Sequence, residues 1–361
     1  MHIGVNLGFG RLHENLTDEQ MFLHELELAE LSERLGYDSL WAVEHHFTDY
    51  SMCPDPMTVL AYVAGRTQRI RLGTAAIILP WNQPVRVAER MVMLDIMSGG
   101  RVLLGLGRGL SRREYLPFGI PLDETRERFD EAANLVVQAL EAGYAEGNGR
   151  FYPVPRTPLR PEPRASFRDR LYCVAGSPDS IVSAVALGAR LMSFITRPVR
   201  DLMPTFDSYR NQYQEKHGVP APPIQLNVNM YCHEDADVAK ERFSRYVNRF
   251  FMKNVEHYEM AGSHFADIKG YERYATLSQA LRDAGLENAA AAYVASALGG
   301  TPSQILEQVS VVQEVMGSFD LVLVPSFGGM PYEEAQHSLE LFAAEVMPAV
   351  RKMAEPAPAA I

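Results

Sequence analysis

The chain has 361 residues, of which 47% are hydrophobic and 22% are charged, so it can bury a large core and is not intrinsically disordered. Its formal net charge is −11 and its basic residues form no block, which argues against nucleic acid or an anionic membrane as the main partner. The chain opens on no signal-peptide pattern, no apolar run approaches the ~20 residues of a membrane span, and its three cysteines are widely spaced. We therefore expect a cytoplasmic protein with reduced thiols.

Short apolar segments alternate with helical ones along the chain. Strands are predicted at residues 3–7, 39–43, 70–79, 102–106, 171–174, 191–195, 226–231 and 321–324. The early helices are predicted at residues 17–35, 57–67 and 85–97, the first opened by a capping box of Thr17 and Gln20. The strands are continuous apolar runs, which indicates a parallel sheet covered on both faces. Eight β–α repeats favour a closed (β/α)8 TIM barrel over an open doubly wound sheet.

Two long excursions interrupt the repeat of a single domain that spans residues 1–351. Residues 145–170 are rich in proline and arginine, and residues 252–298 lie between the seventh and eighth strands. Long insertions on barrels often cover the active site. Within the second excursion, residues 270–298 are mostly small and polar, so we expect them to be mobile alone and ordered over a ligand. Residues 352–361 are expected to form a flexible tail.

Polar residues follow the second predicted strand, where a barrel places its catalytic groups. Glu44, His45 and His46 come directly after an apolar run. Adjacent residues of a strand point to opposite sides, so the two histidines cannot share one pocket, which argues against a metal site of paired histidines. One histidine is expected to face the barrel mouth and the other to pack outside it. A structural role is the usual one for a lone histidine, but this position favours function.

Two neighbouring strand ends carry groups that could bind an anion. Arg108 is exposed between glycines in GLGRGL, residues 105–110, and Ser177 followed by Pro178 predicts a helix N-cap. Free backbone N–H groups there, with the hydroxyls of Ser177 and Ser180, suit a phosphate. A solvated arginine and an ordinary capped helix are the simpler alternatives. Asp179 adds a like charge and counts against the phosphate.

The third predicted strand ends in two small residues. Ala75 and Ala76 lie toward the end of this strand, where a bulky side chain would be expected, and they leave space against which a flat ring could lie. Small residues that pack under a helix would give the same pattern.

Five segments together resemble the bacterial luciferase-like flavin-dependent monooxygenases, and most of all the catalytic alpha subunit of bacterial luciferase. They are EHHFTDY (44–50), GTAAIILP (73–80), PVRVAERMVMLDIMSGGR (84–101), GLGRGL (105–110) and FAAEVMPAVR (342–351). The resemblance runs from about residue 1 to about residue 351 in the same order, and is densest before residue 120.

The resemblance implies roles at the flavin ring. His45 matches the histidine required for oxygen chemistry beside the reduced flavin, and Glu44 lies where the strand end approaches the isoalloxazine. Ala75 and Ala76 match a non-proline cis peptide on which the ring rests. Phe194 would line the substrate side.

The resemblance also implies the phosphate site of FMN. Arg108 and Arg126 match its arginines, and Ser177 and Ser180 match its hydroxyls. Further cofactor contacts would come from Gly107, Val174, Ala175 and Gly176. The reactive cysteine of luciferase is Gly107 here, and an acidic residue before the phosphate-site serine is Gly176, which puts light emission from an aldehyde in doubt.

The implied activity is a two-component monooxygenase. A separate reductase would supply FMNH2, and a C4a-peroxyflavin formed with O2 would oxygenate a small organic substrate. A homodimer is expected, with neither a metal, a nucleic acid nor a membrane as partner. Two alternatives stay open: an F420-dependent dehydrogenase on the same fold, and a non-catalytic flavin-binding partner subunit. Retention of His45 and Arg108 argues against the second.

Overall fold

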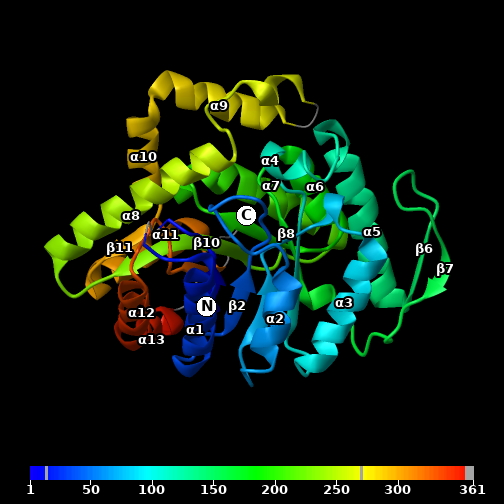
Figure 1. Ribbon diagram of the computed structural model, residues 1–361, viewed down its shortest axis with the longest axis horizontal. Helices are drawn as coiled ribbons and strands as arrows, with labels where there is room; N and C mark the ends of the chain where they lie inside the picture. The colour runs from blue at the N-terminus through cyan, green and yellow to red at the C-terminus, as the bar shows by residue number, and fades with distance from the viewer. Residues whose placement is uncertain (13–14, 269–270, 354–361) are drawn as a thin grey trace.

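The computed structural model describes residues 1–12, 15–268 and 271–353 and contains a closed parallel barrel of eight strands (Figure 1). The strands, in their order around the barrel, are β1 (Ile3–Leu7), β2 (Ser39–Ala42), β3 (Arg71–Thr74), β5 (Val102–Gly107), β8 (Leu171–Val174), β9 (Arg190–Phe194), β10 (Ile224–Cys232) and β12 (Phe319–Val324). The register pairs Gly4 with Ser39 in β2 and with Val322 in β12, which closes the ring. The predicted (β/α)8 fold is confirmed.

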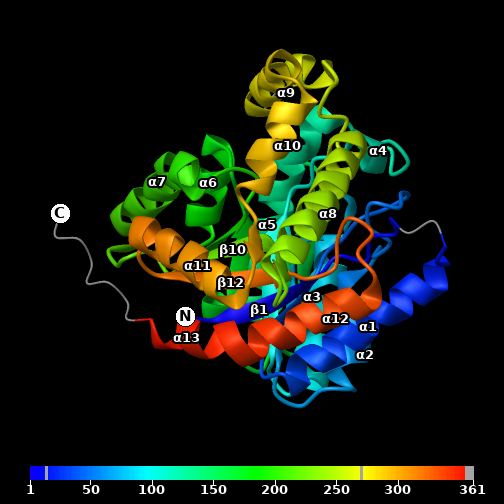
Figure 2. The ribbon, with the colours of Figure 1, turned by 90° about the vertical axis from the view of Figure 1, so that its left-hand side faces the viewer.

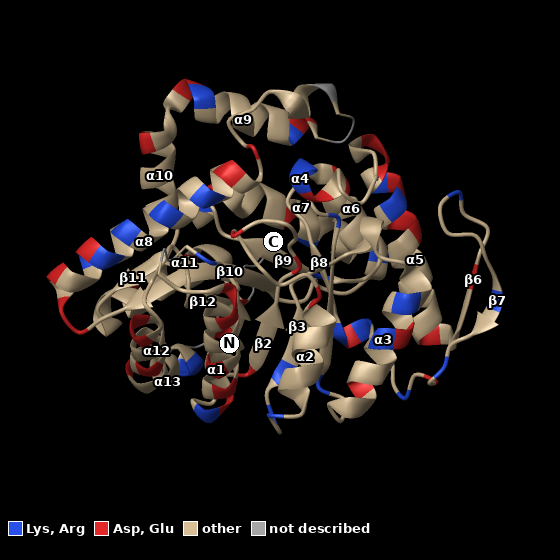
Figure 3. Cartoon of the chain, in the orientation of Figure 1, with Lys and Arg blue, Asp and Glu red and all other residues tan. Residues whose placement is uncertain are grey.

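Helices surround the barrel on its outside. They are α1 (Asp18–Arg34), α2 (Pro56–Ala64), α3 (Pro84–Met97), α4 (Arg112–Tyr115), α5 (Thr125–Ala142), α6 (Pro178–Ala186), α7 (Val199–His217), α8 (Ala236–His257), α11 (Pro302–Met316), α12 (Tyr332–Leu341) and α13 (Met347–Lys352), with a π-helical turn at Phe342–Val346. The capping box predicted for α1 is present: the Thr17 side chain accepts the N–H of Gln20, and the Gln20 side chain accepts that of Thr17. Figure 3 shows that both signs of charge are mixed over the outer helices.

Most predicted boundaries differ from the structure by one or two residues, and two elements differ by more. The strand expected over residues 70–79 is broken after Thr74 by a cis peptide between Ala75 and Ala76, and it resumes as β4 (Ile77–Ile78). Helix α2 ends at Ala64 rather than at residue 67, because Gly65 forms its C-cap. The predicted tail lies mostly outside the described residues, since residues 354–361 are not described.

Side chains fill the barrel interior. Trp41 is completely buried there, where it packs with Ala75, Leu103, Tyr172, Met192 and Val322. Glycine is required opposite the indole, because a Cβ on Gly73 would lie 2.2 Å from a ring carbon of Trp41. A larger apolar core separates the barrel from its helices. The interior is therefore packed, and any ligand must bind at an end of the barrel.

Both excursions have structure of their own. The first forms an antiparallel hairpin of β6 (Tyr144–Gly147) and β7 (Val154–Pro158), which extends to the right in Figure 1. The second continues from α8 through a 3₁₀ turn (His264–Asp267), α9 (Glu272–Ala284) and α10 (Leu286–Val294) to β11 (Leu298–Gly300). Figure 2 shows α9 and α10 above the barrel, at the end that also carries α4. Within the described part of the chain, no helix is both long enough and apolar enough to cross a membrane.

Candidate functional site at the carboxyl end of the barrel

Glu44, which follows β2 and Val43, joins two strand ends through hydrogen bonds. Its Oε2 accepts the backbone N–H of Ile78 at 2.9 Å, and its Oε1 accepts the side chains of Trp81 at 2.6 Å and Asn82 at 2.9 Å. The side chain is buried, and these donors compensate for the loss of water around the carboxylate. An acid can follow the apolar strand because its carboxylate accepts a backbone N–H at the end of the neighbouring strand. The predicted flavin contact of Glu44 stays a prediction.

The two histidines after Glu44 point to different groups, as predicted. His45 Nδ1 lies 2.9 Å from Oε1 of Glu114 in α4, whereas His46 Nε2 lies 3.4 Å from Oε1 of Glu44. The His46 ring also packs edge-on against Trp81, with the ring centroids 5.5 Å apart. His46 therefore belongs to the packing around Glu44, and His45 belongs to a separate polar cluster.

Glu114 is the centre of that cluster. Its Oε1 also accepts the backbone N–H of His46 at 2.8 Å, and Nε2 of His257 lies 3.6 Å from it. Burial alone would raise the pKa of Glu114, but the His45 and His257 rings hold this pKa well below its usual range. Burial lowers the pKa of His257, and Nδ1 of His257 lies 2.9 Å from the hydroxyl of Thr48. The carboxylate is thus ionised, and the His45 ring donates a hydrogen bond to it, while His257 lies just beyond hydrogen-bond distance.

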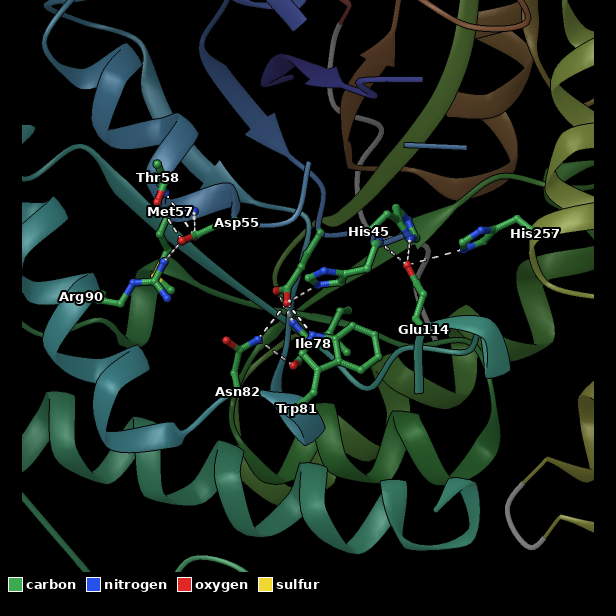
Figure 4. A network of polar contacts seen from close by, with 12 residues as sticks. His45, Asp55, Met57, Thr58, Ile78, Trp81, Asn82, Arg90, Glu114 and His257 are labelled. Atoms are coloured by element: carbon green, nitrogen blue, oxygen red, sulfur yellow. Dashed lines mark hydrogen bonds and ion pairs between the residues drawn. The ribbon is translucent and has the colours of Figure 1, made fainter. Parts of the chain in front are cut away.

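The loop that leads from β2 to α2 is anchored at its far end. Asp55 caps α2 by accepting the N–H groups of Met57 at 3.1 Å and Thr58 at 3.2 Å, and it forms an ion pair with Arg90 of α3 (Figure 4). With Glu44 fixed at one end and Asp55 at the other, the segment that carries His45 is held at both ends.

A strip of small residues runs beside this cluster. The peptide between Ala75 and Ala76 is cis, as the resemblance implied, and both residues are buried. Gly107 ends β5 opposite Ile78. A Cβ at Gly107 would lie 3.0 Å from Cδ1 of Ile78 and 3.2 Å from Cβ of Ala76. A side chain at this position would therefore crowd Ile78 and Ala76.

Arg108 is buried, with 8% of its surface exposed, so the exposure expected from its flanking glycines was wrong. Its guanidinium carbon lies 4.3 Å from the centre of the Tyr271 ring, just before α9, and its carbonyl accepts the hydroxyl of Tyr115. Tyr271 is fully buried and shares a 3.1 Å hydrogen bond with the hydroxyl of Thr125. A residue from the second excursion therefore covers the arginine.

Arg126 lies in the first turn of α5, close to Arg108. Its guanidinium is 3.4 Å from the Ser183 hydroxyl, and its buried Nε has no hydrogen-bond partner among the described residues. Burial, together with the charge of Arg108, lowers the pKa of Arg126. The two positive charges repel each other, so an anion bound near both would be favoured.

The predicted N-cap of α6 is confirmed. The Ser177 side chain accepts the N–H of Ser180, and the Ser180 hydroxyl accepts the N–H groups of Gly176 at 3.0 Å and Ser177 at 2.9 Å. An unexpected cation reaches this turn from α9: Nη1 of Arg273 lies 3.9 Å from the place that a Cβ on Gly176 would take. Burial and the charge of Arg197 lower the pKa of Arg273. Val174 and Ala175 lead the chain from β8 into the turn.

Two surface cavities lie at opposite ends of the barrel. One of about 250 Å³ is near the His45 cluster and is lined by residues that include Thr48, Tyr50, Arg113 and His257. One of about 380 Å³ lies before the strands, between residues that include His2, Asp38 and Arg71. The strands of such barrels present their chemistry at the carboxyl end, so the larger cavity is not the candidate site.

Comparison with known proteins identifies the family. The sequence model of the luciferase-like monooxygenases matches residues 1–318. The chain belongs to this family. It is therefore an oxidoreductase, and the expected resemblance is confirmed.

Similar proteins cover most of the chain. The oxygenase component of the flavin-dependent trigonelline monooxygenase of Acinetobacter baylyi is 27% identical over 259 residues, which are 69% of this chain and 71% of the relative. The alkanal monooxygenase alpha chain of Photorhabdus luminescens is 27% identical over 251 residues, 68% of each chain. The crystal structure of monooxygenase RslO1 from Streptomyces bottropensis has a TM-score of 0.74 and 29% identity, and covers 97% of this chain and 99% of that one.

Two more distant structures share the fold alone, and they differ in cofactor. The oxygenating constituent of a 3,6-diketocamphane monooxygenase of Pseudomonas putida, in complex with FMN, has a TM-score of 0.75 at 20% identity, over 99% of both chains. An F420-dependent secondary alcohol dehydrogenase has a TM-score of 0.69 at 17% identity, over 97% of this chain and 99% of that one. The fold of this luciferase-like protein therefore leaves open which of these cofactors it takes.

Three site residues were missed by the sequence analysis. Glu114 had a usable signal, because it is an acid in the loop after a barrel strand that already carried Arg108. His257 and Arg273 had none, since each lies in a polar helical stretch far along the chain from its partners. Phe194, predicted to line the substrate side, ends β9 with 38% of its surface exposed, and its role stays a prediction.

Proposed function

We propose that this protein is the oxygenase of a two-component monooxygenase, which takes FMNH2 from a separate reductase and uses O2 to oxygenate a small organic substrate. The observation that carries the proposal is the buried Nε of Arg126, which has no hydrogen-bond partner among the described residues, at the same end of the barrel as Arg108, the α6 N-terminus and His45. One ligand would then place its phosphate against the arginines and its flat ring against the strip of small residues.

The residues present fit the phosphate of FMN. Arg126 has a buried Nε without a partner, and it lies close enough to Arg108 for the two charges to repel. A doubly charged phosphate would remove both penalties. At the α6 N-terminus, the Ser180 hydroxyl could turn from the backbone N–H groups of Gly176 and Ser177 to the ligand and free those N–H groups as donors. Arg273 adds a third cation at that turn.

The residues also fit a flat ring. Ala75, Ala76 and Gly107 present methyl groups and bare backbone in neighbouring strands, so a planar system could approach closely there. Glu44 would act indirectly, because it holds the end of β4 through Ile78 and so fixes the position of this strip.

Bound FMNH2 would supply the electron pair that activates O2, and the protein would manage protons and water around it. His45 is the titratable side chain placed for proton transfer. Its Nδ1 is occupied by Glu114, which leaves Nε2 as its working nitrogen. Tyr271 and α9 would close the phosphate end and help to exclude water from the ring.

The main rival is a dehydrogenase that uses F420 on the same fold. The two cofactors can be distinguished by titrating the protein, under argon, with photoreduced FMN and with reduced F420, and measuring both dissociation constants by fluorescence. Preference for reduced FMN, with oxygen-dependent turnover, would support the proposal. Preference for F420, with turnover that ignores oxygen, would replace it by the dehydrogenase. Flavin binding without turnover of a broad substrate panel would indicate the non-catalytic subunit.

A further inference from the structure

Three side chains continue behind His45 toward the protein surface. Oε1 of Glu114 lies 2.9 Å from Nδ1 of His45 and 3.6 Å from Nε2 of His257, and Nδ1 of His257 lies 2.9 Å from the hydroxyl of Thr48. Figure 4 shows the two histidine rings on either side of the Glu114 carboxylate. Glu114 and His257 are each 1% exposed, whereas Thr48 lines the 250 Å³ surface cavity. The row therefore connects a strand end to solvent through two buried groups from distant parts of the chain.

The ionised carboxylate fixes where each ring carries its hydrogen. An ionised Glu114 can only accept hydrogen bonds, so Nδ1 of His45 must be protonated. The lone pair of a neutral His45 ring is then on Nε2. Nε2 of His257 faces the same carboxylate at 3.6 Å, so we expect the hydrogen of neutral His257 to be on Nε2 and its Nδ1 to accept the Thr48 hydroxyl hydrogen. The two histidines thus hold opposite tautomers against one carboxylate.

We propose that Glu114 and His257 are positioning residues for His45, an inference that rests on the proposed function. Glu114 holds the ring in the tautomer with Nδ1–H, opposite to the one that free histidine prefers. Nε2 of His45 is therefore the nitrogen that exchanges protons with the reacting groups. When Nε2 takes up a proton, the nearby carboxylate offsets the new positive charge.

His257 restrains Glu114 in this arrangement. The carboxylate of Glu114 receives direct hydrogen bonds from the His45 ring and the backbone of His46, while Nε2 of His257 lies 3.6 Å from the same oxygen, beyond hydrogen-bond distance. The His257 ring packs edge-on against the His45 ring, with the centroids 5.2 Å apart. Without His257, the carboxylate would lose this polar neighbour and could turn from His45. The hydrogen bond with Thr48 in turn fixes the His257 ring.

The same three residues, His45, Glu114 and His257, also have the composition of a metal site, because their ligand atoms all lie within 4.8 Å of one another. The observed contacts favour hydrogen bonding. The 2.9 Å separation of Nδ1 and Oε1 is a direct bond between the would-be ligands, and the same oxygen accepts the His46 N–H. A zinc ion about 2.0–2.2 Å from each ligand would have to break both bonds. Metal binding is therefore the competing outcome of the test.

The test reads the tautomers in the flavin-free, full-length protein. In a ¹⁵N-histidine sample, long-range ¹H–¹⁵N spectra distinguish Nδ1–H from Nε2–H, and the variants His45→Gln and His257→Gln assign the two rings. We expect His45 to be protonated on Nδ1 and His257 on Nε2. Because this experiment needs no flavin, its result is independent of the proposed function. An Nε2–H tautomer for His45 in the unaltered protein would overturn the proposal.

Variants of Glu114 sharpen the test. Glu114→Met removes the acceptor at similar size, and we expect His45 to move to the Nε2–H tautomer. Glu114→Gln retains a carbonyl acceptor and is expected to keep Nδ1–H. Glu259→Met is the matched control. Glu259 forms an ion pair at 2.8 Å with Arg112, which lies on the same helix as Glu114, and its replacement should leave the tautomer of His45 unchanged. An unchanged His45 signal in folded Glu114→Met protein would contradict the positioning role.

Two further measurements separate the alternatives. With FMNH2 bound, Glu114→Met is expected to lower turnover at least ~10-fold while the flavin dissociation constant changes little. If the unaltered protein did not bind FMNH2, the proposed function would be refuted, but the tautomer assignment would still hold. Elemental analysis with and without EDTA tests the metal. A stoichiometric divalent ion whose removal shifts both histidine signals would overturn the proposal in favour of a metal site.

Discussion

The two ends of the barrel bury charged groups in different ways. At the amino end, opposite charges meet: Asp38 lies 2.9 Å from Arg351 and accepts the backbone N–H of Ile3, and Asp320 lies 3.7 Å from Arg190. At the carboxyl end, Glu114 and His45 also pair, but cations there act on cations as well: burial and then the charge of Arg108 lower the pKa of Arg126, and burial and then the charge of Arg197 lower that of Arg273.

The difference shows what each end is built for. Paired charges at the amino end satisfy one another and join the first and last strands, which is a stabilising arrangement. Crowded cations at the carboxyl end raise the energy of the empty protein and lower that of an anion complex. The ion pairs at the amino end need no bound anion to balance their charges. Substitutions at the two kinds of site should therefore have different effects, the largest of which is given first.

The largest effect is expected at His45. Replacing His45 by Ala should reduce product formation by about 10²–10⁴-fold, because proton transfer by a placed side chain contributes about that much. Binding of FMNH2 should stay within a few-fold. His46→Ala is the comparison: His46 packs on Glu44 and Trp81, so its loss should lower Tm more than turnover. Turnover of His45→Ala at the parental rate would show that the catalytic assignment is wrong.

A large pH-dependent effect on stability is expected at Glu25, a buried acid of α1. Burial raises the pKa of Glu25 to about 7, although contacts with the Ser326 side chain and with the backbone of Phe9 and Gly8 oppose this shift. A raised pKa means that its stabilising contribution is complete below about pH 4.5 and is lost as the pH rises through about 7. Glu25→Gln should therefore stabilise the protein by up to about 3 kcal/mol at pH 8 and hardly at pH 4.5.

Thermal unfolding between pH 4.5 and 8 measures this effect. Glu33→Gln, at the other end of α1, is the matched control with the opposite sign. Burial opposes ionisation of Glu33, but three backbone N–H groups lower its pKa, so its contribution is present at neutral pH and is lost in acid. A Glu25→Gln variant with the same Tm difference at every pH would refute the assigned shift.

Removing Arg108 tests the crowded cations directly. A charge-assisted hydrogen bond is worth about 1.5–3 kcal/mol, so Arg108→Ala should raise the FMNH2 dissociation constant by roughly 10- to 100-fold. Riboflavin has no phosphate, and its binding should hardly change. Equal losses for FMN and riboflavin would mean that Arg108 holds the ring or Tyr271 rather than a phosphate.

A smaller effect of the same kind is expected at Arg273. This arginine is half-buried, so Arg273→Ala should weaken FMNH2 by roughly 3- to 10-fold, again without affecting riboflavin. Arg282 on the same helix is the control, because it donates to the carbonyl of Gly262 at 2.6 Å within its own segment. If Arg282→Ala raised the FMNH2 dissociation constant as much as Arg273→Ala does, the effect would belong to α9 as a whole and not to Arg273.

Much of the fold could be predicted because short-range sequence patterns indicate its strands and helices. The apolar run of Ile3–Leu7 and the capping box of Thr17 and Gln20 are short-range signals, and both appear where expected. The break between Ala75 and Ala76 could not come from strand propensity, because both neighbours of the break suit a strand. It followed only from the family resemblance.

The candidate site was predicted only where it follows a strand. Glu44, His45 and Arg108 directly follow strands or glycine turns, so their place at the mouth could be read from order along the chain. His257 lies 209 residues from Thr48 along the chain, and Arg273 reaches the α6 N-terminus from α9. Only the folded structure shows that both belong to the site. The burial of Arg108 was missed for the same reason, since Tyr271 covers it from far along the sequence.

We propose above all that the carboxyl end of the barrel is a site where bound, reduced FMN reacts with oxygen. The direct measurement is stopped-flow absorbance: the protein is loaded with photoreduced FMN under argon and then mixed with oxygenated buffer. We predict an oxygen-dependent intermediate that outlives the reaction of free FMNH2, and whose decay speeds up in His45→Ala. Reoxidation at the rate of free flavin, with all of the oxygen recovered as H2O2 in the presence of every substrate tested, would contradict the claim.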